Sequence, residues 1–584
     1  MTGKPWLQHY DPDVPLTLAP YPQRTLIDVL RAAAGERPNH PALIFKGIPL
    51  SYEALERQSN ALANALLALG IHQGERVALI LPNSPQTLVC QFGVWKAGAV
   101  AAPVNPLYTQ DELEHALQVS GATAAVALTP FYAKVKAVQP RTGLRFVIAT
   151  NIKEYLSPVL RLLFTLAKEK KEGHRITLQA GDYRLQELLQ MHAHAAVPSV
   201  RVAAGDPAVL LFTGGTTGTP KAAIGTHGGL VMAGMQLHAW LGAVMQPWVD
   251  PVLCNMPLFH VYGQGGVLTC ALVGHHPLVM VPNPRDLEDV LATIRKSRPA
   301  FLPGVPTLFI ALLNHPKVLA GKADLRSVKL CLCGAAPLLA DTKQRFEALT
   351  GGRIVEGYAL TESIMATVLT PVNGTYKAGS TGLPLPDVEL RIVDTEGGTR
   401  DLPAGTVGEV LMQAPQLMQG YWQNPEETAL VVRDGWLYTG DLGYLDEDGY
   451  LFLVDRKKDV IKPSGFQVWP REVEEVLAAH GAVAEVGVAG VPDAYSGEAV
   501  KAWVVLRAGQ QVSVEELRAY CGEKLAAYKV PKQIEFRTAL PKSMVGKVLR
   551  RELAAEAIRS QTETEQATTE RAATVPHDRE KVPA

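Results

Sequence analysis

A chain of 584 residues is too long for a single hydrophobic core, so we expect several subdomains. Hydrophobic residues make up 47% of the chain and charged residues 19%, which is typical of a well-packed soluble protein. The net charge of -1 argues against a nucleic-acid partner, because such a partner requires a basic face.

The six cysteines show no metal-binding pattern. Cys331 and Cys333 lie one residue apart in an apolar run, which is not the spacing of metal ligands. Buried, reduced thiols are therefore expected, and they indicate a cytoplasmic protein. Residues 1–9 lack the apolar core of a signal peptide, and no apolar run reaches transmembrane length.

Residues 23–150 alternate between helix-like and strand-like segments. Apolar side chains recur at helical spacing over residues 52–69, Gly70 ends that helix, and residues 76–81 follow as a buried strand. The next two expected elements are a helix at 111–118 and a strand at 124–128. This alternation predicts an α/β body with a mainly parallel sheet.

Residues 155–171 form an insertion with the pattern of an amphipathic helix. Five large apolar residues lie near one face of that helix, and three lysines follow them: Val159, Leu160, Leu162, Leu163 and Leu166, then Lys168, Lys170 and Lys171. Such a helix can rest on an anionic membrane, which here would give peripheral contact at the inner membrane face. More often, the apolar face of such a helix packs on its own domain. The sequence leaves both alternatives open.

A loop rich in glycine and threonine follows an apolar strand-like run at 208–212. Its members are Thr213, Gly214, Gly215, Thr216, Thr217, Gly218, Thr219, Pro220 and Lys221. Glycines let the backbone approach a ligand closely, while hydroxyl groups, backbone N–H groups and a lysine can hold phosphate oxygens. The loop lacks the Gly-Lys-Ser/Thr ending of the common phosphate loop, and no Gly-x-Gly-x-x-Gly fingerprint joins a strand to a helix. We therefore expect a nucleotide site of another kind.

The α/β alternation resumes from residue 200 to about 370, with a buried strand at 328–333. Beyond residue 380, strand-like runs at 388–393, 408–412 and 450–454 predict a small, distorted β unit. A charged break at 455–459 then separates a compact α+β domain of roughly 100 residues. Its expected elements are a helix at 470–479, strands at 483–491 and 499–506, and a helix at 514–525 that begins with Ser513 and Glu516 at capping-box spacing.

The predicted fold is thus a large N-terminal α/β domain with parallel sheets and a small β unit, followed by a smaller, mobile α+β domain. We expect the large domain to span residues 1–454 and the small one residues 455–557. Residues 558–584 are rich in Thr, Glu, Gln, Lys and Pro, which predicts a disordered tail.

Three shorter motifs carry groups suited to nucleotide chemistry. In residues 356–362, Tyr358 offers a ring for a base to stack on, Thr361 a hydroxyl and Glu362 a carboxylate for Mg²⁺. Asp441, in a glycine-flanked turn, could hold both hydroxyls of a ribose. Lys547 tips a loop that precedes a helix at 549. Alone, the first motif is weak evidence, Asp441 is better explained as an ordinary turn aspartate, and Lys547 as a solvated loop lysine.

In this order, the motifs resemble those of the acyl-adenylate-forming superfamily of AMP-binding enzymes, which includes acyl-CoA ligases, adenylation domains of peptide synthetases and luciferases. The resemblance extends over roughly residues 25–557, a large body and a small one. It is closest to the long-chain fatty acid–CoA ligases, through residues 213–218, 257–263 (PLFHVYG) and 301–306 (FLPGVP).

The resemblance implies an ATP-dependent ligase that forms an acyl adenylate and then an acyl-CoA, with ATP, Mg²⁺ and coenzyme A as its cofactors and a free fatty acid as its substrate. Residues 213–221 would hold the β- and γ-phosphates of ATP. The other nucleotide-binding residues implied are Gly334, Ala335, Ala336, Pro337, Gly357 and Tyr358 for the adenine, Thr361 for the α-phosphate, Glu362 for Mg²⁺, and Asp441 and Arg456 for the ribose.

The same resemblance assigns the remaining chemistry. Lys547 would bridge the acyl carboxylate and the α-phosphate, Asp455 would be the hinge between the domains, and His260 would lie near the acyl carboxylate. The residues implied for the CoA step are Lys462, Gly465, Phe466 and Gln467, and those for the acyl pocket are Val261, Tyr262, Gly263, Gln264 and Gly304. Glycine beside a pocket leaves room for a chain, but this stretch and His260 could equally belong to the core.

Several alternatives remain open at this stage. The run at 462–468 looks partly like that of the aryl-CoA ligases, so an aryl- or branched-acid CoA ligase is the nearest alternative. An enzyme that loads a carrier protein and a non-catalytic acyl-adenylate binder are the others. Ala222 stands where many members carry glycine, and Gly215 where serine is commoner. The oligomeric state is not predicted, and a dimer is one option.

Overall fold

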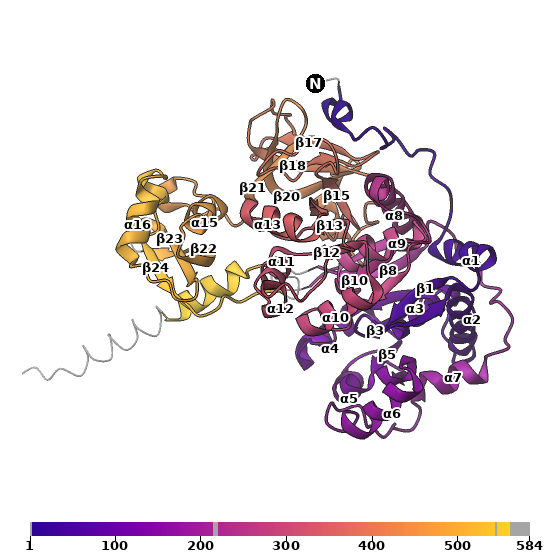
Figure 1. Ribbon diagram of the computed structural model, residues 1–584. Coiled ribbons are helices and arrows are strands. Elements are labelled where there is room, and N and C mark those ends of the chain that lie inside the picture. Colours follow the sequence, from indigo (N-terminus) through magenta and orange to yellow (C-terminus); the bar gives the residue numbers. More distant parts are fainter. Residues whose placement is uncertain (1–2, 214–219, 494, 544–545, 561–584) are drawn as a thin grey trace, which may run out of the picture.

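The computed structural model describes residues 3–213, 220–493, 495–543 and 546–560. Figure 1 shows a large body, which extends to strand β21 (Leu451–Arg456), and a smaller C-terminal body beside it. Within the described residues, the strands form sheets of nine, seven, five and three strands. The predicted fold class, a large α/β domain followed by a small α+β domain, is confirmed.

The seven-stranded sheet is built mainly from the N-terminal part of the chain. In spatial order its strands are β7 (Tyr183–Arg184), β6 (Phe146–Thr150), β5 (Ala124–Leu128), β3 (Arg76–Ile80), β4 (Val100–Pro103), β8 (Pro207–Phe212) and β9 (Ala222–Thr226). Neighbouring strands are parallel except for β8 and β9, which are antiparallel. The β8–β9 hairpin therefore carries the glycine- and threonine-rich loop at one edge of this sheet.

Both faces of this sheet are buried, as its nearly continuous apolar strands require. Along β5, Ala125 and Ala127 belong to a core shared with α4 (Gln110–Ser120) and α5 (Tyr132–Val138). Ala124 and Val126 point to the opposite core. The helices on that side are α2 (Tyr52–Ala68), α3 (Pro85–Lys96) and α7 (Leu185–Met191). The period of two along the strand thus divides its side chains between two helical layers.

The nine-stranded sheet shares a hydrophobic core with the seven-stranded one, and several candidate site residues lie on it or next to its strands. In spatial order its strands are β16 (Leu383–Pro384), β15 (Ala366–Leu369), β14 (Arg353–Ala359), β13 (Leu330–Cys333), β12 (Phe301–Gly304), β10 (Val252–Cys254), β11 (Leu278–Met280), β1 (Pro41–Phe45) and β2 (Ile48–Ser51). The helices associated with it are α1 (Leu26–Glu36), α8 (His227–Leu241), α9 (Thr269–Val273), α10 (Leu287–Ser297), α11 (Pro306–Leu313), α12 (Pro316–Leu319) and α13 (Ala340–Thr350). Strands β12, β13 and β14 are parallel, so the segments that follow them meet at one edge.

The small β unit expected after residue 380 is an antiparallel sheet. Its strands are β17 (Glu389–Val393), β18 (Gly408–Gln413), β20 (Trp436–Leu445), β19 (Val432–Arg433) and β21, with α14 (Pro425–Val431) leading into β19. The β20–β21 ladder places Asp441 directly opposite Arg456. This register brings the two residues implied for the ribose side by side.

The C-terminal body has the predicted α+β pattern. Its elements are α15 (Pro470–Ala478), β22 (Val483–Asp493), β23 (Gly497–Leu506), α16 (Val514–Gly522), β24 (Gln533–Phe536) and a helix at 550–560. The capping box at Ser513 and Glu516 is formed, with each side chain bonded to the backbone of the other residue. The helix at 550–560 continues past residue 557, and residues 561–584 of the expected tail lie outside the described residues.

The insertion at 155–171 forms the expected helix, α6 (Pro158–Ala167). None of its residues is buried. The alternative in which the apolar face of this helix packs on its own domain is therefore wrong. The orientation of α6 reverses the usual rule that an amphipathic helix turns its apolar face to the core.

The prediction of buried thiols is confirmed, because all six cysteines are buried and none forms a disulfide. In the part of the chain that the structure describes, no helix is both long and apolar enough to span a bilayer.

Candidate active site

The glycine- and threonine-rich loop is closed at its base by its two described ends. The Thr213 backbone N–H donates to the Lys221 carbonyl at 2.8 Å, directly beyond the last β8–β9 pair, Phe212 with Ala222. Residues 214–219, predicted to hold phosphate, lie outside the described residues. Lys221 is thus positioned at the end of a buried hairpin, on the rim of the predicted phosphate site.

Lys221 is bound by a group that the sequence analysis did not consider. Its ammonium group forms an ion pair with Glu427 on α14 and lies 5.2 Å from the centre of the Tyr421 ring. Both contacts fix the position of the ammonium group. An incoming phosphate would therefore compete with the Glu427 carboxylate for Lys221.

The carboxylate expected to bind Mg²⁺ lies on the other side of the same tyrosine. The Tyr421 hydroxyl donates to Glu362 Oε1 at 2.6 Å, and the Glu362 carbonyl accepts from the Met418 backbone N–H at 2.9 Å. Glu362 and Lys221 therefore share Tyr421 as a neighbour. Thr361, the preceding residue, lies in the turn after β14, where its carbonyl accepts from the Ile364 backbone N–H at 3.0 Å.

A polar triad joins the β20–β21 ladder to β14, with Tyr358 and Asp441 buried and Arg456 half-buried. Asp441 accepts from the Tyr358 hydroxyl at 2.6 Å and pairs with Arg456 at 3.0 Å. The Asp441 charge raises the pKa of the Arg456 guanidinium, and burial followed by the same charge raises the pKa of Tyr358 well above its usual range. The Asp441 carboxylate, held beside the Arg456 guanidinium, is suited by its position to accept hydrogen bonds from a vicinal diol.

The residues expected around the adenine meet at the carboxyl ends of parallel strands. Gly334 follows β13, and a side chain there would approach the carbonyl of Gly357 on β14 at 3.6 Å and the Tyr262 ring at 3.7 Å. Ala335 adopts a left-handed backbone with φ of 69°, a strained state that recurs at functional sites. The remaining members of this predicted group, Ala336 and Pro337, complete the turn after it.

The predicted acyl pocket is partly a packed core. The Tyr262 hydroxyl donates to the Leu332 carbonyl at 2.6 Å and accepts from the Gly304 backbone N–H at 3.2 Å, so two predicted pocket residues are in contact. Val261 and Gln264 are buried, and neither polar atom of the Gln264 side chain has a hydrogen-bond partner. A buried amide without a partner is costly, which marks Gln264 as a position where a ligand or water could bind.

Gly263 corrects one part of that prediction. It lies in a π-helical segment, Tyr262–Leu268, and a Cβ atom at position 263 would be 2.2 Å from the Pro257 carbonyl oxygen. The space expected for an acyl chain at this glycine is therefore occupied by backbone. The glycine permits close packing of two chain segments.

His260 precedes this segment and is neutral at physiological pH. Its Nδ1 atom accepts from the Tyr262 backbone N–H at 3.2 Å, and burial lowers the pKa of the imidazole to about 4. A neutral ring with a bonded Nδ1 can donate from Nε2 toward a ligand carboxylate. Its predicted place near the acyl carboxylate remains a prediction.

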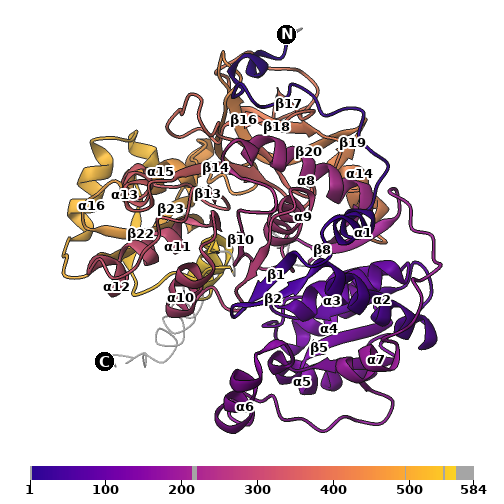
Figure 2. The ribbon, with the colours of Figure 1, turned by 45° about the vertical axis from the view of Figure 1, so that its right-hand side comes forward.

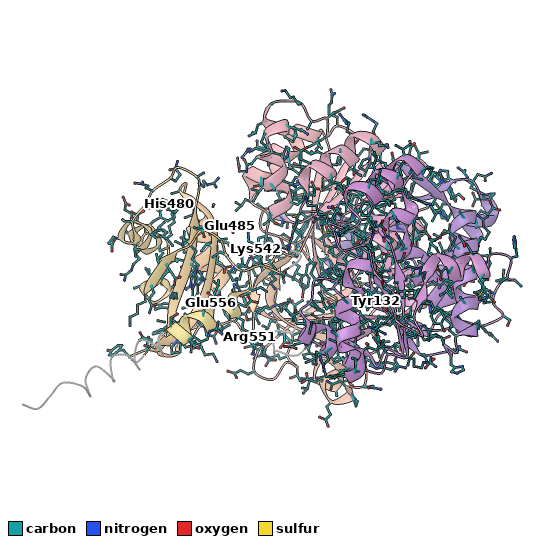
Figure 3. All side chains as sticks on the ribbon, turned by 90° about the horizontal axis from the view of Figure 1, so that it is seen from below. Tyr132, His480, Glu485, Lys542, Arg551 and Glu556 are labelled. Carbon is teal, nitrogen blue, oxygen red and sulfur yellow. The ribbon has the colours of Figure 1, made fainter. Side chains whose placement is uncertain are left out.

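Lys547 of the C-terminal body faces the large body. The loop that carries it is a tight turn, in which the Ser543 and Gly546 backbone N–H groups donate to the Lys547 and Ser543 carbonyls. A side chain at Gly546 would lie 2.8 Å from Thr307 Oγ1 at the start of α11, so this turn docks beside β12. Figure 3 shows Lys542, at the base of the loop, on the side of the C-terminal body nearest the large body.

The electrostatic environment of Lys547 lowers the pKa of its amine to about 8. Desolvation is the largest cause, the Arg456 charge adds to it, and the Asp441 charge opposes it. The amine thus lies within electrostatic range of the triad described above. An anionic phosphate bound there would raise the pKa of the Lys547 amine back toward its ordinary value.

Asp455, the predicted hinge, is anchored to the C-terminal body. Its carboxylate accepts from Arg550 Nη1 at 2.8 Å and from the Arg471 backbone N–H at 2.7 Å. Arg550 also binds Glu474, and burial raises the pKa of that carboxyl. This ion cluster fastens the end of β21 to the small domain in the observed orientation.

The residues implied for the CoA step are in a different place. Lys462, Phe466 and Gln467 are exposed, and Gly465 lies in the 3₁₀ turn Pro463–Gly465. The Lys462 backbone N–H donates to Glu498, and the Phe466 ring stacks on Tyr528 with ring centres 4.7 Å apart. These partners belong to the C-terminal body. The observed orientation thus presents Lys547, and not the 462–467 segment, to the residues predicted to bind the nucleotide.

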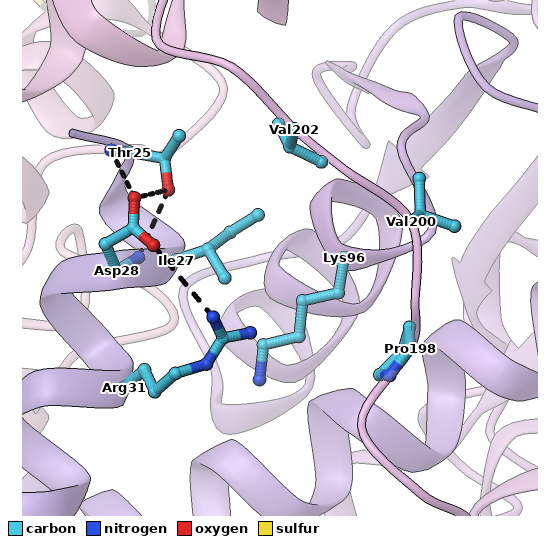
Figure 4. Close-up of a pocket in the computed structure, with 8 residues that line it drawn as sticks. All are labelled: Thr25, Ile27, Asp28, Arg31, Lys96, Pro198, Val200 and Val202. Atoms are coloured by element: carbon cyan, nitrogen blue, oxygen red, sulfur yellow. Dashed lines mark hydrogen bonds and ion pairs between the residues drawn. The ribbon is translucent and has the colours of Figure 1, made fainter. Parts of the chain in front are cut away.

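A small cavity lies away from the predicted site residues. It has a volume of about 50 Å³ and lies beside the buried amine of Lys96. Figure 4 shows the residues that line it: Thr25, Ile27, Asp28, Arg31, Lys96, Pro198, Val200 and Val202. None of the predicted site residues lines it. Small-molecule sites are several times larger, so this cavity does not compete as the substrate site.

Tyr421 and Glu427 are the site residues that sequence reasoning missed. Glu427 follows Asn424 and Pro425, and the Asn424 side chain caps α14 by accepting from the Glu427 backbone N–H. That local pattern fully explains the glutamate as a helix start. Its pairing with Lys221 joins residues 206 positions apart, which no local pattern encodes.

Comparisons with known proteins agree with this geometry. The sequence profile of the family described as AMP-binding enzyme matches residues 30–422, and that of the AMP-binding enzyme C-terminal domain matches residues 472–547. The chain is 39% identical to the long-chain-fatty-acid–CoA ligase of Bacillus subtilis, over 95% of this chain and 98% of that protein.

Two solved structures have the same architecture. ATP-bound MatB from Rhodopseudomonas palustris superposes with a TM-score of 0.79 at 29% identity, covering 92% of this chain and 99% of that one. The anthranilate CoA ligase AuaEII in complex with anthranoyl-AMP superposes with a TM-score of 0.80 at 27% identity, covering 94% and 99%. The predicted family is confirmed: the chain belongs to the AMP-binding enzymes, with both the large domain and the C-terminal domain of that family.

Proposed function

We propose that this chain is an AMP-forming fatty acid–CoA ligase that takes long-chain acids. The observation that carries the proposal is the position of Lys547, which a loop of the small domain holds within electrostatic range of Asp441 and Arg456. The identity to the B. subtilis ligase, together with family membership, supports the acyl class.

In the first half-reaction, the acid carboxylate attacks the α-phosphorus of ATP, pyrophosphate leaves, and a mixed anhydride forms. Like charges oppose this approach. Lys547 would bridge the two anions and stabilise charge that develops at the α-phosphate, while Lys221 and the loop behind it would hold the leaving phosphates. Asp441 would accept from the ribose hydroxyls, oriented by Tyr358 and Arg456.

The donor set fits a magnesium ion bound mainly through the nucleotide. Among the residues that the structure describes, no three His, Cys, Asp or Glu side chains form a ligand group. Mg²⁺ usually takes one or two protein carboxylates and completes its shell with phosphates and water. Glu362 would supply that carboxylate, and the bound ion would neutralise phosphate charge.

In the second half-reaction, the CoA thiol displaces AMP from the acyl carbon. That step requires different groups at the same carbon, and water must be excluded so that the anhydride is not hydrolysed. The exposed residues Lys462, Phe466 and Gln467 would face the site only after the small domain has turned about Asp455. Turning would require the Asp455–Arg550 pair or its neighbours to rearrange.

The test is a panel of free acids assayed for CoA-dependent AMP release. We expect turnover with saturated acids of long chain and little with benzoate or anthranilate. Turnover confined to aryl or branched acids would refute the long-chain substrate but leave the proposed two-step reaction in place. Acyl-AMP formation without CoA turnover would favour a carrier-protein ligase. No AMP release with any acid would refute the proposal in favour of an acyl-adenylate binder.

A further inference from the structure

Helix α6 turns its apolar face away from the protein. Exposed leucines are common singly, but here they are gathered on one helix. The exposed fractions are 68% for Val159, 41% for Leu160, 61% for Leu162, 55% for Leu163 and 77% for Leu166. At 100° per residue, these side chains occupy one side of the helix.

The polar side of the helix holds it in this orientation. Arg161 donates to the Glu154 carbonyl at 2.6 Å and to the Lys153 carbonyl at 3.2 Å. The Lys153 amine donates to Thr165 at 3.1 Å, and the Phe164 ring meets the His174 ring edge-on at 5.1 Å. The outward direction of the apolar face is therefore fixed by specific contacts on the opposite side.

The same segment is basic although the chain as a whole is not. Residues 157–175 contain five basic and two acidic residues, while the whole chain carries -1. Both acidic residues already have partners, since Glu169 pairs with Lys153 at 2.6 Å and Glu172 with Lys168 at 3.4 Å. Lys170, Lys171 and Arg175 follow the helix and are exposed.

The helix lies at an extremity of the molecule. Figures 1 and 2 both show α6 at the lower edge of the large body, away from the C-terminal body. A surface that contacted α6 would leave the small domain free to turn.

We propose that α6 and the basic residues after it dock on an anionic lipid surface. The apolar face would enter the boundary between headgroups and acyl chains, and Lys168, Lys170 and Lys171 would lie against lipid phosphates. A second copy of the chain is a poorer occupant. A helix of ten residues is about 15 Å long and too small for a stable dimer interface, and two such basic segments would repel each other.

The experiment measures partition of the full chain onto vesicles by flotation. The vesicles consist of phosphatidylcholine alone or of equal parts phosphatidylcholine and phosphatidylglycerol. We expect binding to the anionic vesicles that weakens with salt, and a loss of at least roughly tenfold in Leu162→Glu/Leu166→Glu. In Lys170→Glu/Lys171→Glu, the partition coefficient onto anionic vesicles should fall about fivefold for each lysine replaced.

Matched controls separate this surface from general effects. The first control, Leu319→Glu/Met191→Glu, changes two large apolar side chains outside α6 whose exposed fractions are 68% and 75%. The second, Lys322→Glu/Lys524→Glu, changes two exposed lysines outside the α6 segment. Both should bind like the parent chain. Binding of the α6 variants at parental strength, equal binding to neutral vesicles, or a dimer that the α6 variants dissociate would overturn the proposal. The assay needs no turnover, so its result is independent of the enzymatic proposal.

Discussion

The lowered pKa of Lys547 predicts an alkaline limit on adenylate formation. With a pKa of about 8, the amine is about 90% protonated at pH 7 and about 9% at pH 9. Only the protonated form can bridge two anions, so kcat/KM for adenylate formation should fall about tenfold over that interval. A lysine of ordinary pKa would lose only a few per cent of its charge.

The direction of this pH dependence follows from the causes that lower the pKa of Lys547. Desolvation and the Arg456 charge disfavour the ammonium form in the free enzyme, so charge is lost as the pH rises through 8. His260, with a pKa of about 4, is neutral throughout this range and does not contribute. kcat/KM reports groups of the free enzyme, which is the state in which this environment exists.

The assay is acid-dependent exchange of pyrophosphate into ATP, measured from pH 6.5 to 9.5 without CoA. Lys547→Arg should remove the alkaline limb, because a guanidinium stays protonated, although its activity will be lower throughout. In Lys547→Ala, the rate of adenylation should fall by a factor on the order of 10²–10³, while thiolysis of a supplied acyl adenylate should continue. A flat profile in the parent enzyme, an unchanged limb in Lys547→Arg, or equal loss of both half-reactions would refute the reasoning.

The remaining predictions concern positioning, the hinge and the second step. Tyr421→Phe leaves Glu362 without its short hydrogen bond and should lower the free energy of unfolding by about 1.5–3 kcal/mol; urea unfolding measures this, and an unchanged midpoint and slope would contradict it. Arg550→Gln leaves buried Asp455 without its cation and should cost roughly 3–5 kcal/mol; calorimetry should show earlier melting, and parental melting would mean that the cluster does not fasten the domains. Gly465→Leu should reduce thioester formation more than adenylation in separate half-reaction assays, and unchanged CoA turnover would count against the proposed thiol path.

Much of the fold could be predicted because its signals are local. The capping box at Ser513 and Glu516 requires groups only three positions apart, and a buried strand such as β5 is encoded by its own apolar run. The hairpin that carries Thr213 and Lys221 is equally local. These patterns arise because the free energy of a helix start or a strand depends first on neighbours in the chain.

Contacts between distant segments were not predictable in this way. Tyr421 lies between Lys221 and Glu362 only because the β8–β9 hairpin and the segment after β14 meet in space. Gly263 was predicted to leave space for the acyl chain. In the folded protein, the Pro257 carbonyl oxygen occupies that space.

The sequence by itself determined the family, the order of the motifs, the α/β class and the existence of an amphipathic helix within 155–171. Only the tertiary structure decided which groups meet and which way that helix faces. Periodicity defines an apolar side of a helix, but its direction depends on what packs behind it, and here Arg161 and Thr165 hold the polar side inward. The same reason applies at the active site, where burial and the charge of Arg456, a residue distant in the sequence, lower the pKa of Lys547.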